Sequence, residues 1–290
     1  MNTFYKKHIP YLFLLPAFIF LIIFFFLPFF ETLIISFKDY SNDIYTPVFA
    51  GFDNYKALFK SHEFYISLLN TFLFLGMVVP VLAFVPLITA IFINQKIRGI
   101  SLYKVLIYLP VIVSIVVVAI AFKWIYADEG IFNYIVSIFG GKSIGWLTDT
   151  HFALLSVALV TIYKGIGYYM IIYLSALMSV PKELYEAAKT DGANLFIEHL
   201  TVTIPQIMPT IALVVTMSSI SALKVFAEIY VMTKGGPLNS TKTIVYYIYE
   251  RAFENLDLSA ASSASVVLLA IILVFSVINI TFFENKRYKL

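Results

Sequence analysis

The sequence predicts an all-α polytopic integral membrane protein with six transmembrane helices, organised as a single domain over residues 1–290. Hydrophobic residues make up 61% of the chain, and the mean hydropathy is +0.90. Charged residues make up only 13%, whereas soluble domains are about 25% charged. No linker, low-complexity tract or internal repeat divides the chain, so the apolar stretches are assigned to one domain.

Six apolar stretches are long enough to cross a bilayer, whose core of about 30 Å requires roughly 20 helical residues. Backbone amides in hydrocarbon must be bonded within their own segment, so each stretch is predicted to be a helix. The predicted spans cover approximately 11–36, 68–94, 105–125, 153–177, 205–223 and 264–284. The first stretch is longer than the apolar region of a signal peptide and lacks a small-residue cleavage site, so we expect it to be retained.

The distribution of Lys and Arg predicts the side of the membrane on which each connection lies. One set of connections has 10 basic residues in 52 positions and comprises 1–10, 95–104, 178–203 and 285–290. The other set has 8 in 98 positions and comprises 37–67, 126–152 and 224–263. Because basic residues favour the cytoplasmic side, both termini and residues 178–203 are predicted to be cytoplasmic.

Composition also excludes several classes of function. The net charge is only +3 and the basic residues are scattered, which excludes the clustered basic surface of a nucleic-acid binder. The chain has no Cys, so disulfides and thiolate metal sites are excluded. The four His residues form no i,i+4 pair, and we expect no metal site and no bound cofactor; they are His8, His62, His151 and His199.

A charged segment between the fourth and fifth spans is predicted to form two short helices at the membrane surface. Pro181 suits a first helical turn, early acidic residues suit the positive end of the helix dipole, and Gly192 can adopt a left-handed stop. A second short helix is expected from Asn194, before Pro205 opens the fifth span. In it we expect three apolar side chains to be buried, namely Leu195, Phe196 and Leu200.

Small side chains at Ala187 and Ala188 make a nearly flat patch on the first of these helices. Such a patch lets the backbone of a partner come close. The alternative is an ordinary amphipathic connection resting on lipid. The acid-rich balance of the segment disfavours lipid, because helices on a lipid surface are rich in Lys and Arg.

The segment resembles the EAA signature of the membrane subunits of binding-protein-dependent ABC importers. That signature is EAA, three residues, G, nine residues, I, one residue, LP, and here Val202 replaces Ile and Ile204 replaces Leu. The resemblance implies that the segment is the coupling helix that docks into a separate ATPase. The implied docking residues are Glu183, Glu186, Ala187, Ala188, Asp191, Gly192 and Pro205.

Nearly the whole chain is similar to the carbohydrate branch of these permeases, related to the first membrane subunit of maltose, glycerol-3-phosphate and oligosaccharide systems. The motifs that carry the similarity include GFDNYKALF, YKGIGYYMIIYLSAL and VFAEIYVMTKGGPLNSTKTIVYYIYERAF. In the last, Lys234 replaces a usual Gly and Ala227-Glu228 replaces a usual Asp. The resemblance implies the MetI-like fold of ABC-importer permeases.

The resemblance implies a permease subunit of an ATP-driven carbohydrate importer in a bacterial cytoplasmic (inner) membrane, forming half of the translocation pathway. The implied partners are a second homologous permease subunit, two ABC ATPase subunits and an extracytoplasmic solute-binding protein. The chain itself is expected to be no enzyme. Gly141-Lys142-Ser143 is no phosphate-binding loop because Val136 stands where that loop needs Gly, so ATP is expected to be bound by the partner subunits.

The candidate substrate path follows the fourth span, where Lys164 would be costly unless it faces protein or water. Aromatic faces and hydrogen-bond donors bind sugars, which makes six residues candidates for the path: Lys164, Tyr168, Tyr169, Tyr173, Ser218 and Asn279. The alternative is that Lys164 caps carbonyl groups between helices, that the tyrosines pack, and that the hydroxyls hold helices together.

The connection after the fifth span is predicted to reverse in a tight turn at Gly235-Gly236-Pro237. A helix along the outer membrane surface is expected to follow, with an aromatic belt at Tyr246, Tyr247, Tyr249 and Phe253.

Three other functions remain as alternatives to a carbohydrate importer. An ion-coupled secondary transporter would need several intramembrane acidic groups, whereas the predicted spans offer essentially one buried ionisable residue, Lys164. A membrane-embedded sugar transferase would need clustered Asp, Glu or His near one membrane face, and here they are dispersed. A permease for a non-sugar solute such as glycerol phosphate is also left open.

Overall fold

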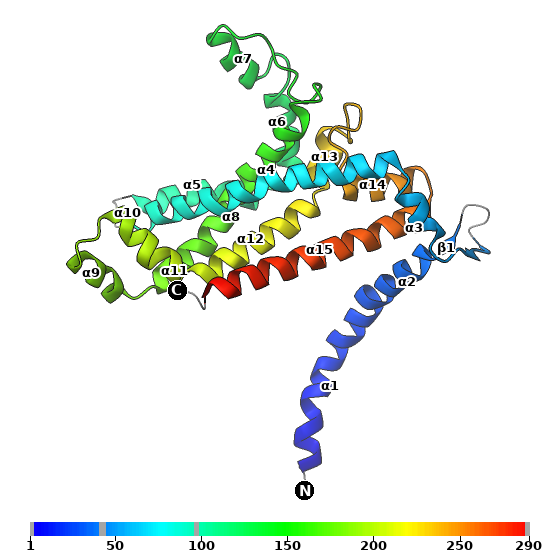
Figure 1. Cartoon of the computed structure of the whole chain (residues 1–290), viewed down its shortest axis with the longest axis horizontal. Coiled ribbons are helices and arrows are strands. Elements are labelled where there is room, and N and C mark those ends of the chain that lie inside the picture. The colour runs from blue at the N-terminus through cyan, green and yellow to red at the C-terminus, as the bar shows by residue number, and fades with distance from the viewer. Residues whose placement is uncertain (1–2, 41–44, 96–98, 288–290) are drawn as a thin grey trace. The chain divides into compact units, whose positions relative to one another are not determined.

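A computed structural model describes residues 3–40, 45–95 and 99–287, with side chains from residue 11 to residue 283 within those ranges. Helices make up most of the described chain, which confirms the all-α prediction (Figure 1). The exception is a two-stranded antiparallel ladder of β1 (Lys38–Asp39) and β2 (Val48–Phe49). Several basic residues of the predicted cytoplasmic connections lie outside the described residues or side chains, namely Lys6, Lys7, Lys96, Arg98, Lys286, Arg287 and Lys289.

The chain forms two compact units. The first comprises Met1–Ser61 and Ile248–Leu269. Its first span runs through α1 (Thr3–Leu21), the π-helix η1 (Ile22–Phe26) and α2 (Leu27–Ser36), followed after the strands by α3 (Asp53–Leu58). The unit also holds the π-helix η3 (Glu250–Glu254) and the beginning of α15 (Leu258–Arg287).

Polar contacts connect the parts of the first unit just after α2 ends. The side-chain amide of Asn54 donates to the carbonyl oxygens of Ser36 and Lys38, both at 2.9 Å. The backbone N–H of Tyr40 donates to Ser259 Oγ at 3.0 Å. These bonds fix the exit of the first span against α3 and the start of α15. The most apolar stretch of the span itself is not buried within this chain, as suits a surface that faces lipid or another subunit.

The second unit comprises His62–Tyr247 and Ala270–Leu290, and three long helices form its centre. They are α4 (His62–Ile93), α8 (Ala153–Ser179) and α12 (Met208–Leu223). Their facing sides bury Phe74, Val157 and Val214 completely. The core of the unit therefore lies where these three helices meet.

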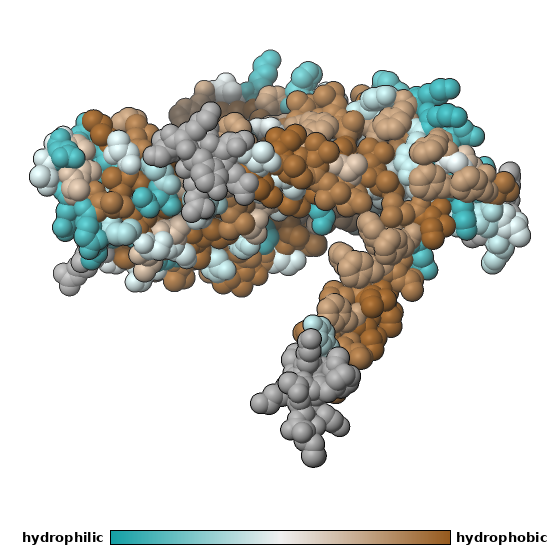
Figure 2. Space-filling view, turned by 60° about the horizontal axis from the view of Figure 1, so that its bottom comes forward, coloured by the Kyte–Doolittle hydropathy of each residue, from teal (hydrophilic) through white to brown (hydrophobic). Residues whose placement is uncertain are grey.

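Among the residues that the structure describes, five helical segments are long and apolar enough to cross a membrane, and a sixth candidate is bent. The five are Tyr11–Ser36, His62–Ile93, Ala153–Ser179, Met208–Met232 and Leu258–Phe283. They match five of the six predicted spans. Figure 2 shows hydrophobic side chains over the helices of the chain and hydrophilic ones toward the end that carries α9 (Lys182–Thr190).

The third predicted span, 105–125, is wrong as a continuous helix. The structure instead has α5 (Ile100–Ile112) and α6 (Ile115–Ile125), bent by 98° at the break between them. Val113 is extended there, with ψ 138°. The ammonium group of Lys164 donates to the carbonyl oxygens of Val111 at 3.0 Å and Val113 at 2.9 Å, so carbonyls near the break have partners.

Short helices of the second unit include α7 (Ile131–Ile138), α13 (Ala227–Met232) and the greater part of α14 (Ile244–Tyr249). The predicted turn after α13 is confirmed, with Gly235 at φ +78° and the Thr241 hydroxyl donating to the Gly236 carbonyl at 2.7 Å. The predicted interfacial belt is wrong for Tyr246 and Tyr247. They are 3% and 1% exposed because their rings pack inside the unit, against Phe226 and Phe64 respectively.

A glycine on α8 allows α5 to approach closely. A Cβ atom at Gly167 would clash with the backbone carbonyl oxygen of Ile107, which cannot move as a side chain can. Gly76 on α4 is a matched comparison, since a Cβ there would meet nothing within 4 Å.

We predict that Gly167→Ala lowers the free energy of unfolding by about 1–3 kcal/mol, the usual cost of overpacking. Gly76→Ala should leave it unchanged or raise it by up to about 1 kcal/mol, because Ala is the better helix former. Thermal unfolding of the two purified variants in detergent measures the difference. Equal melting temperatures would show that α5 does not need this close contact.

Candidate functional site

The two short helices predicted between the fourth and fifth spans, at about 181–203, are called the bracket below. The first of them is α9, and its ends follow from its sequence. Pro181 is extended at the N-terminal cap, and Glu183 lies in the first turn, near the positive end of the helix dipole. At the other end Gly192 has φ +83°, a conformation that glycine adopts without strain. The N–H of Ala193 bonds to the Ala188 carbonyl at 2.9 Å and that of Gly192 to the Lys189 carbonyl at 3.0 Å, which together form a Schellman cap.

The structure places most of the implied docking residues on the exposed side of this bracket. The exposed ones are Glu183, Glu186, Ala187, Asp191 and Gly192. Ala188 is half-buried, and Pro205 is half-buried at the first turn of α11 (Ile204–Gln206). Six of the seven therefore lie together on α9 and its C-terminal cap, whereas Pro205 lies at the entry to the fifth span.

The second helix is shorter than expected, and one prediction about it is wrong. α10 covers only Leu195–Glu198, capped by the Asn194 side chain, and continues into the π-helix η2 (His199–Thr203). The three apolar side chains that we expected to be buried are exposed, with Leu195 at 63%, Phe196 at 72% and Leu200 at 47%. Glu198 is buried instead, because this short helical turn directs it toward α9.

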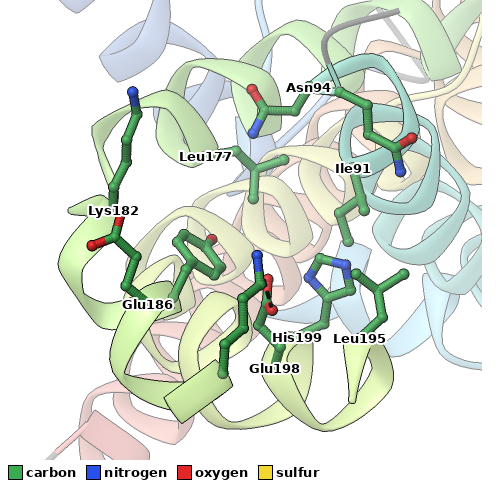
Figure 3. A pocket seen from close by; sticks show the side chains of 11 residues that line it. Ile91, Asn94, Leu177, Lys182, Glu186, Leu195, Glu198 and His199 are labelled. Carbon is green, nitrogen blue, oxygen red and sulfur yellow. Dashed lines mark ion pairs between the residues drawn. The ribbon is translucent and has the colours of Figure 1, made fainter. Parts of the chain in front are cut away.

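A pocket of about 340 Å³ lies beneath α9, between it, α10 and the ends of α4 and α8 (Figure 3). Ile91 and Asn94 line it from the end of α4, and Leu177 lines it from α8. The remaining lining residues include Tyr185, Lys189, Glu198 and His199. No local spacing in the sequence marks these four residues, because they come from separate elements and meet only in the folded chain.

The candidate path residues of α8 are placed in different surroundings. Lys164 is half-buried, and its ammonium group bonds to the break between α5 and α6. Tyr169 and Tyr173 are 4% and 0% exposed, and the Tyr173 hydroxyl donates to the Ala83 carbonyl at 3.1 Å. Tyr168 is 41% exposed, with its ring 5.1 Å from that of Tyr169.

The other two candidate path residues lie on different helices. Ser218 on α12 is fully buried and donates to the Val215 carbonyl of its own helix at 3.1 Å. Asn279 on α15 is half-buried, and its side-chain amide lies 3.5 Å from the Ser219 hydroxyl. Two contacts are seen among these candidates and their neighbours: the rings of Tyr168 and Tyr169 are adjacent, and Asn279 contacts α12 through Ser219. Within the described residues, no group of three His, Cys, Asp or Glu could hold a metal ion.

These features define a class of protein, a polytopic helical membrane subunit with an exposed polar bracket between two of its spans. Residues 44–286 match the family described as the inner membrane component of binding-protein-dependent transport systems. The match covers most of the chain, and the chain belongs to this family.

Relatives along nearly the whole chain agree with this membership. The lactose transport system permease LacF of Rhizobium radiobacter is 33% identical, over 92% of this chain and 91% of its own length. The arabinooligosaccharide transport system permease AraP of Bacillus subtilis is 32% identical, over 95% and 88% respectively.

Solved structures of the same kind confirm the ABC-importer permease fold. A chain of a bacterial ABC transporter involved in the import of the acidic polysaccharide alginate matches with a TM-score of 0.85. It is 26% identical, and the match covers 97% of this chain and 96% of the other. A bacterial alginate transporter in complex with a periplasmic protein bound to alginate pentasaccharide matches with the same TM-score, identity and coverage.

We predict that Lys164→Met destabilises the chain, because it removes two donors to carbonyls at the break between α5 and α6. Carbonyl groups that lose their partners at a break in a membrane segment, where water is absent, cost about 1–3 kcal/mol, or a drop of several degrees in melting temperature. Lys123→Met is the control, since exposed Lys123 makes a longer bond of 3.3 Å to the Val231 carbonyl. Thermal unfolding in detergent compares the melting temperatures of the two variants. Equal melting temperatures would show that Lys164 does not stabilise the chain by capping these carbonyls.

Proposed function

We propose that the chain is the permease subunit of an ATP-driven carbohydrate importer and forms half of its transmembrane pathway. The observation that supports this most is the position of the bracket. A motif with the EAA spacing forms a capped, exposed helix between two membrane-crossing helices of a chain that belongs to the binding-protein-dependent transport family. A helix that only rested on lipid would not need an exposed face rich in acids and alanine.

The relatives support a carbohydrate substrate. LacF is named for lactose, AraP for arabinooligosaccharides, and the matched solved structures for alginate. These solutes share little beyond linked sugar rings, so we infer the class and not the individual sugar. The proposed path residues are Lys164, Tyr168, Tyr169, Tyr173, Ser218 and Asn279, and among them Tyr168 combines an exposed aromatic ring with a hydroxyl.

The proposed partners follow from the surfaces of this chain and from its relatives. A second homologous permease would complete the pathway, and an extracytoplasmic solute-binding protein would deliver the sugar. Two ABC ATPase subunits would supply the energy, one of them docking on α9 and its C-terminal cap. Apolar side chains exposed at 44–72% on the adjoining turn support a protein contact there; they are Leu195, Phe196, Ile197 and Leu200.

We place the chain in a bacterial cytoplasmic membrane with both termini and the bracket on the cytoplasmic side, from the distribution of Lys and Arg. In this role the chain is no enzyme and binds no cofactor; ATP is bound by the partner subunits. ATP-driven closure of the ATPases would displace the bracket. The rigid helices would then switch the paired permeases between inward-facing and outward-facing states.

Reconstitution tests this function directly. The chain is coexpressed with candidate partner subunits, namely a second permease, an ATPase and a solute-binding protein, and the complex is placed in proteoliposomes. We expect uptake of at least one of lactose, arabinooligosaccharides and alginate oligosaccharides, dependent on internal ATP and on the binding protein, and unaffected by proton and sodium ionophores. Uptake that persists without ATP and stops with ionophores would instead show an ion-coupled transporter.

We predict that Ala187→Asp reduces ATPase copurification and ATP-dependent uptake by about tenfold or more, as loss of a central interface contact does. The side chain is exposed, so the added carboxylate should leave membrane insertion and folding intact. Gly192→Pro should have the same effect by a different route, because proline cannot adopt φ +83°.

Ser143→Asp is the matched control for the added charge, since Ser143 is exposed in a connection predicted to lie on the other side of the membrane. It should copurify the ATPase as the unmodified chain does. Unchanged copurification with Ala187→Asp would show that the ATPase docks elsewhere.

A further inference from the structure

The contact between α9 and the rest of the second unit is made mainly by polar side chains. α9 has no buried residue, and the pocket of about 340 Å³ separates it from the ends of α4 and α8. Apolar packing therefore does little to hold α9 in place. A displacement of α9 can reach α8 through the backbone at 180–181, and it can reach the fifth span through the backbone at 191–202 or through the side chains that bridge the gap.

The first bridge joins α9 to the last residue of η2. The hydroxyl of Tyr185 lies 3.1 Å from the hydroxyl of Thr203, which in turn lies 2.9 Å from His199 Nδ1. Thr203 is fully buried, and one hydroxyl can donate one hydrogen bond while accepting others. The three side chains form a continuous hydrogen-bonded chain in either His199 tautomer: Tyr185 donates to Thr203 while Thr203 donates to an unprotonated Nδ1, or a protonated Nδ1 donates to Thr203.

A second bridge joins the C-terminal end of α9 to α10. Lys189 Nζ lies 3.8 Å from Glu198 Oε2, and the Glu198 side chain is only 8% exposed (Figure 3). A buried carboxylate is costly without an opposite charge, so this ion pair favours the position of α9 in which Lys189 stays above Glu198. The two bridges lie at successive turns of α9, at Tyr185 and Lys189, and so resist both translation and rotation of the helix.

Thr203 connects the first bridge to the start of the fifth span. Thr203 directly precedes α11, which leads through Ile207 into α12, and α12 packs against α4 and α8 in the centre of the unit. Ile207 is itself 2% exposed. A force applied to Tyr185 therefore reaches the buried start of the fifth span without passing through the backbone at 191–202, which would bend.

We propose that Tyr185, Thr203 and His199 are positioning residues that transmit the displacement of α9 to α12. This inference rests on the proposed function, because α9 is displaced only if an ATPase docks on it. Through the hydrogen bonds that join Tyr185, Thr203 and His199, the bracket and the fifth span move together. Loss of these bonds uncouples ATP hydrolysis from transport while the ATPase stays bound.

The test measures sugar imported per ATP hydrolysed in proteoliposomes, with the sugar from the panel above that the unmodified complex imports. Tyr185→Phe removes only the hydroxyl, and we expect about a fivefold fall in this ratio, the effect of one lost hydrogen bond. The yield of assembled complex and the amount of bound ATPase should not change. Tyr103→Phe, which removes a hydroxyl from a tyrosine 59% exposed at the start of α5, is the control and should keep the ratio.

A double-mutant cycle separates transmission from a general structural effect. Thr203→Val should lower the ratio as Tyr185→Phe does, and the double variant should be no worse than either, because both break the same chain. Thr203→Ser keeps the hydroxyl and should restore coupling. Additive losses, or an unchanged ratio in Tyr185→Phe, would overturn the inference.

Different results would contradict the proposed function and the proposed role of Tyr185, Thr203 and His199. If the unmodified complex and Tyr103→Phe show no ATP-dependent uptake, the proposed function is wrong and this inference is lost with it. If both import sugar normally and Tyr185→Phe matches them, the proposed function stands and the contacts of Tyr185, Thr203 and His199 do not transmit the displacement of α9.

Discussion

Backbone hydrogen bonding where water is absent is the constraint on which the rest of this structure depends. A long helix satisfies its own amides and carbonyls, which explains the five long, apolar membrane-crossing segments. The pair α5 and α6 breaks this rule with a bend of 98°. The break persists in an apolar chain because a side chain from a different helix supplies donors, Lys164 of α8 bonding to Val111 and Val113.

Close packing is what brings that donor to the break. Gly167 follows Lys164 on the same helix, and only a residue without a Cβ atom fits against the Ile107 carbonyl of α5. Gly165 similarly fits against the Leu82 side chain of α4. α8 thus reaches two neighbouring helices through glycines while its lysine caps the break. Replacing Gly167 affects the bonds of Lys164, and replacing Lys164 affects the contact at Gly167, since both residues set the distance between α8 and α5.

The bracket is held by polar contacts more than by close apolar packing, in contrast to the membrane helices. It has few apolar contacts with the helices, several exposed apolar side chains of its own, and a pocket beneath it. Polar links from Tyr185 and Lys189 hold it in position. An element held in this way can be displaced as a body by a partner, whereas a helix embedded in the core would resist. The same property that makes α9 a weakly packed helix therefore makes it suitable for transmitting motion.

The sequence by itself determined the helical class, five of the spans, the capped helix of the bracket and the family, because apolar length, capping residues and motif spacing are local properties. It did not predict the break between α5 and α6, the burial of Tyr246 and Tyr247, or the exposure of Leu195 and Phe196. Those outcomes were decided by tertiary structure. The break and the two buried tyrosines depend on which distant residue lies opposite, Lys164 at the break and Phe226 and Phe64 beside the tyrosines. Leu195 and Phe196 are exposed because Glu198, paired with Lys189 of α9, occupies the buried side of α10. A local sequence pattern does not indicate which distant residues will be in contact.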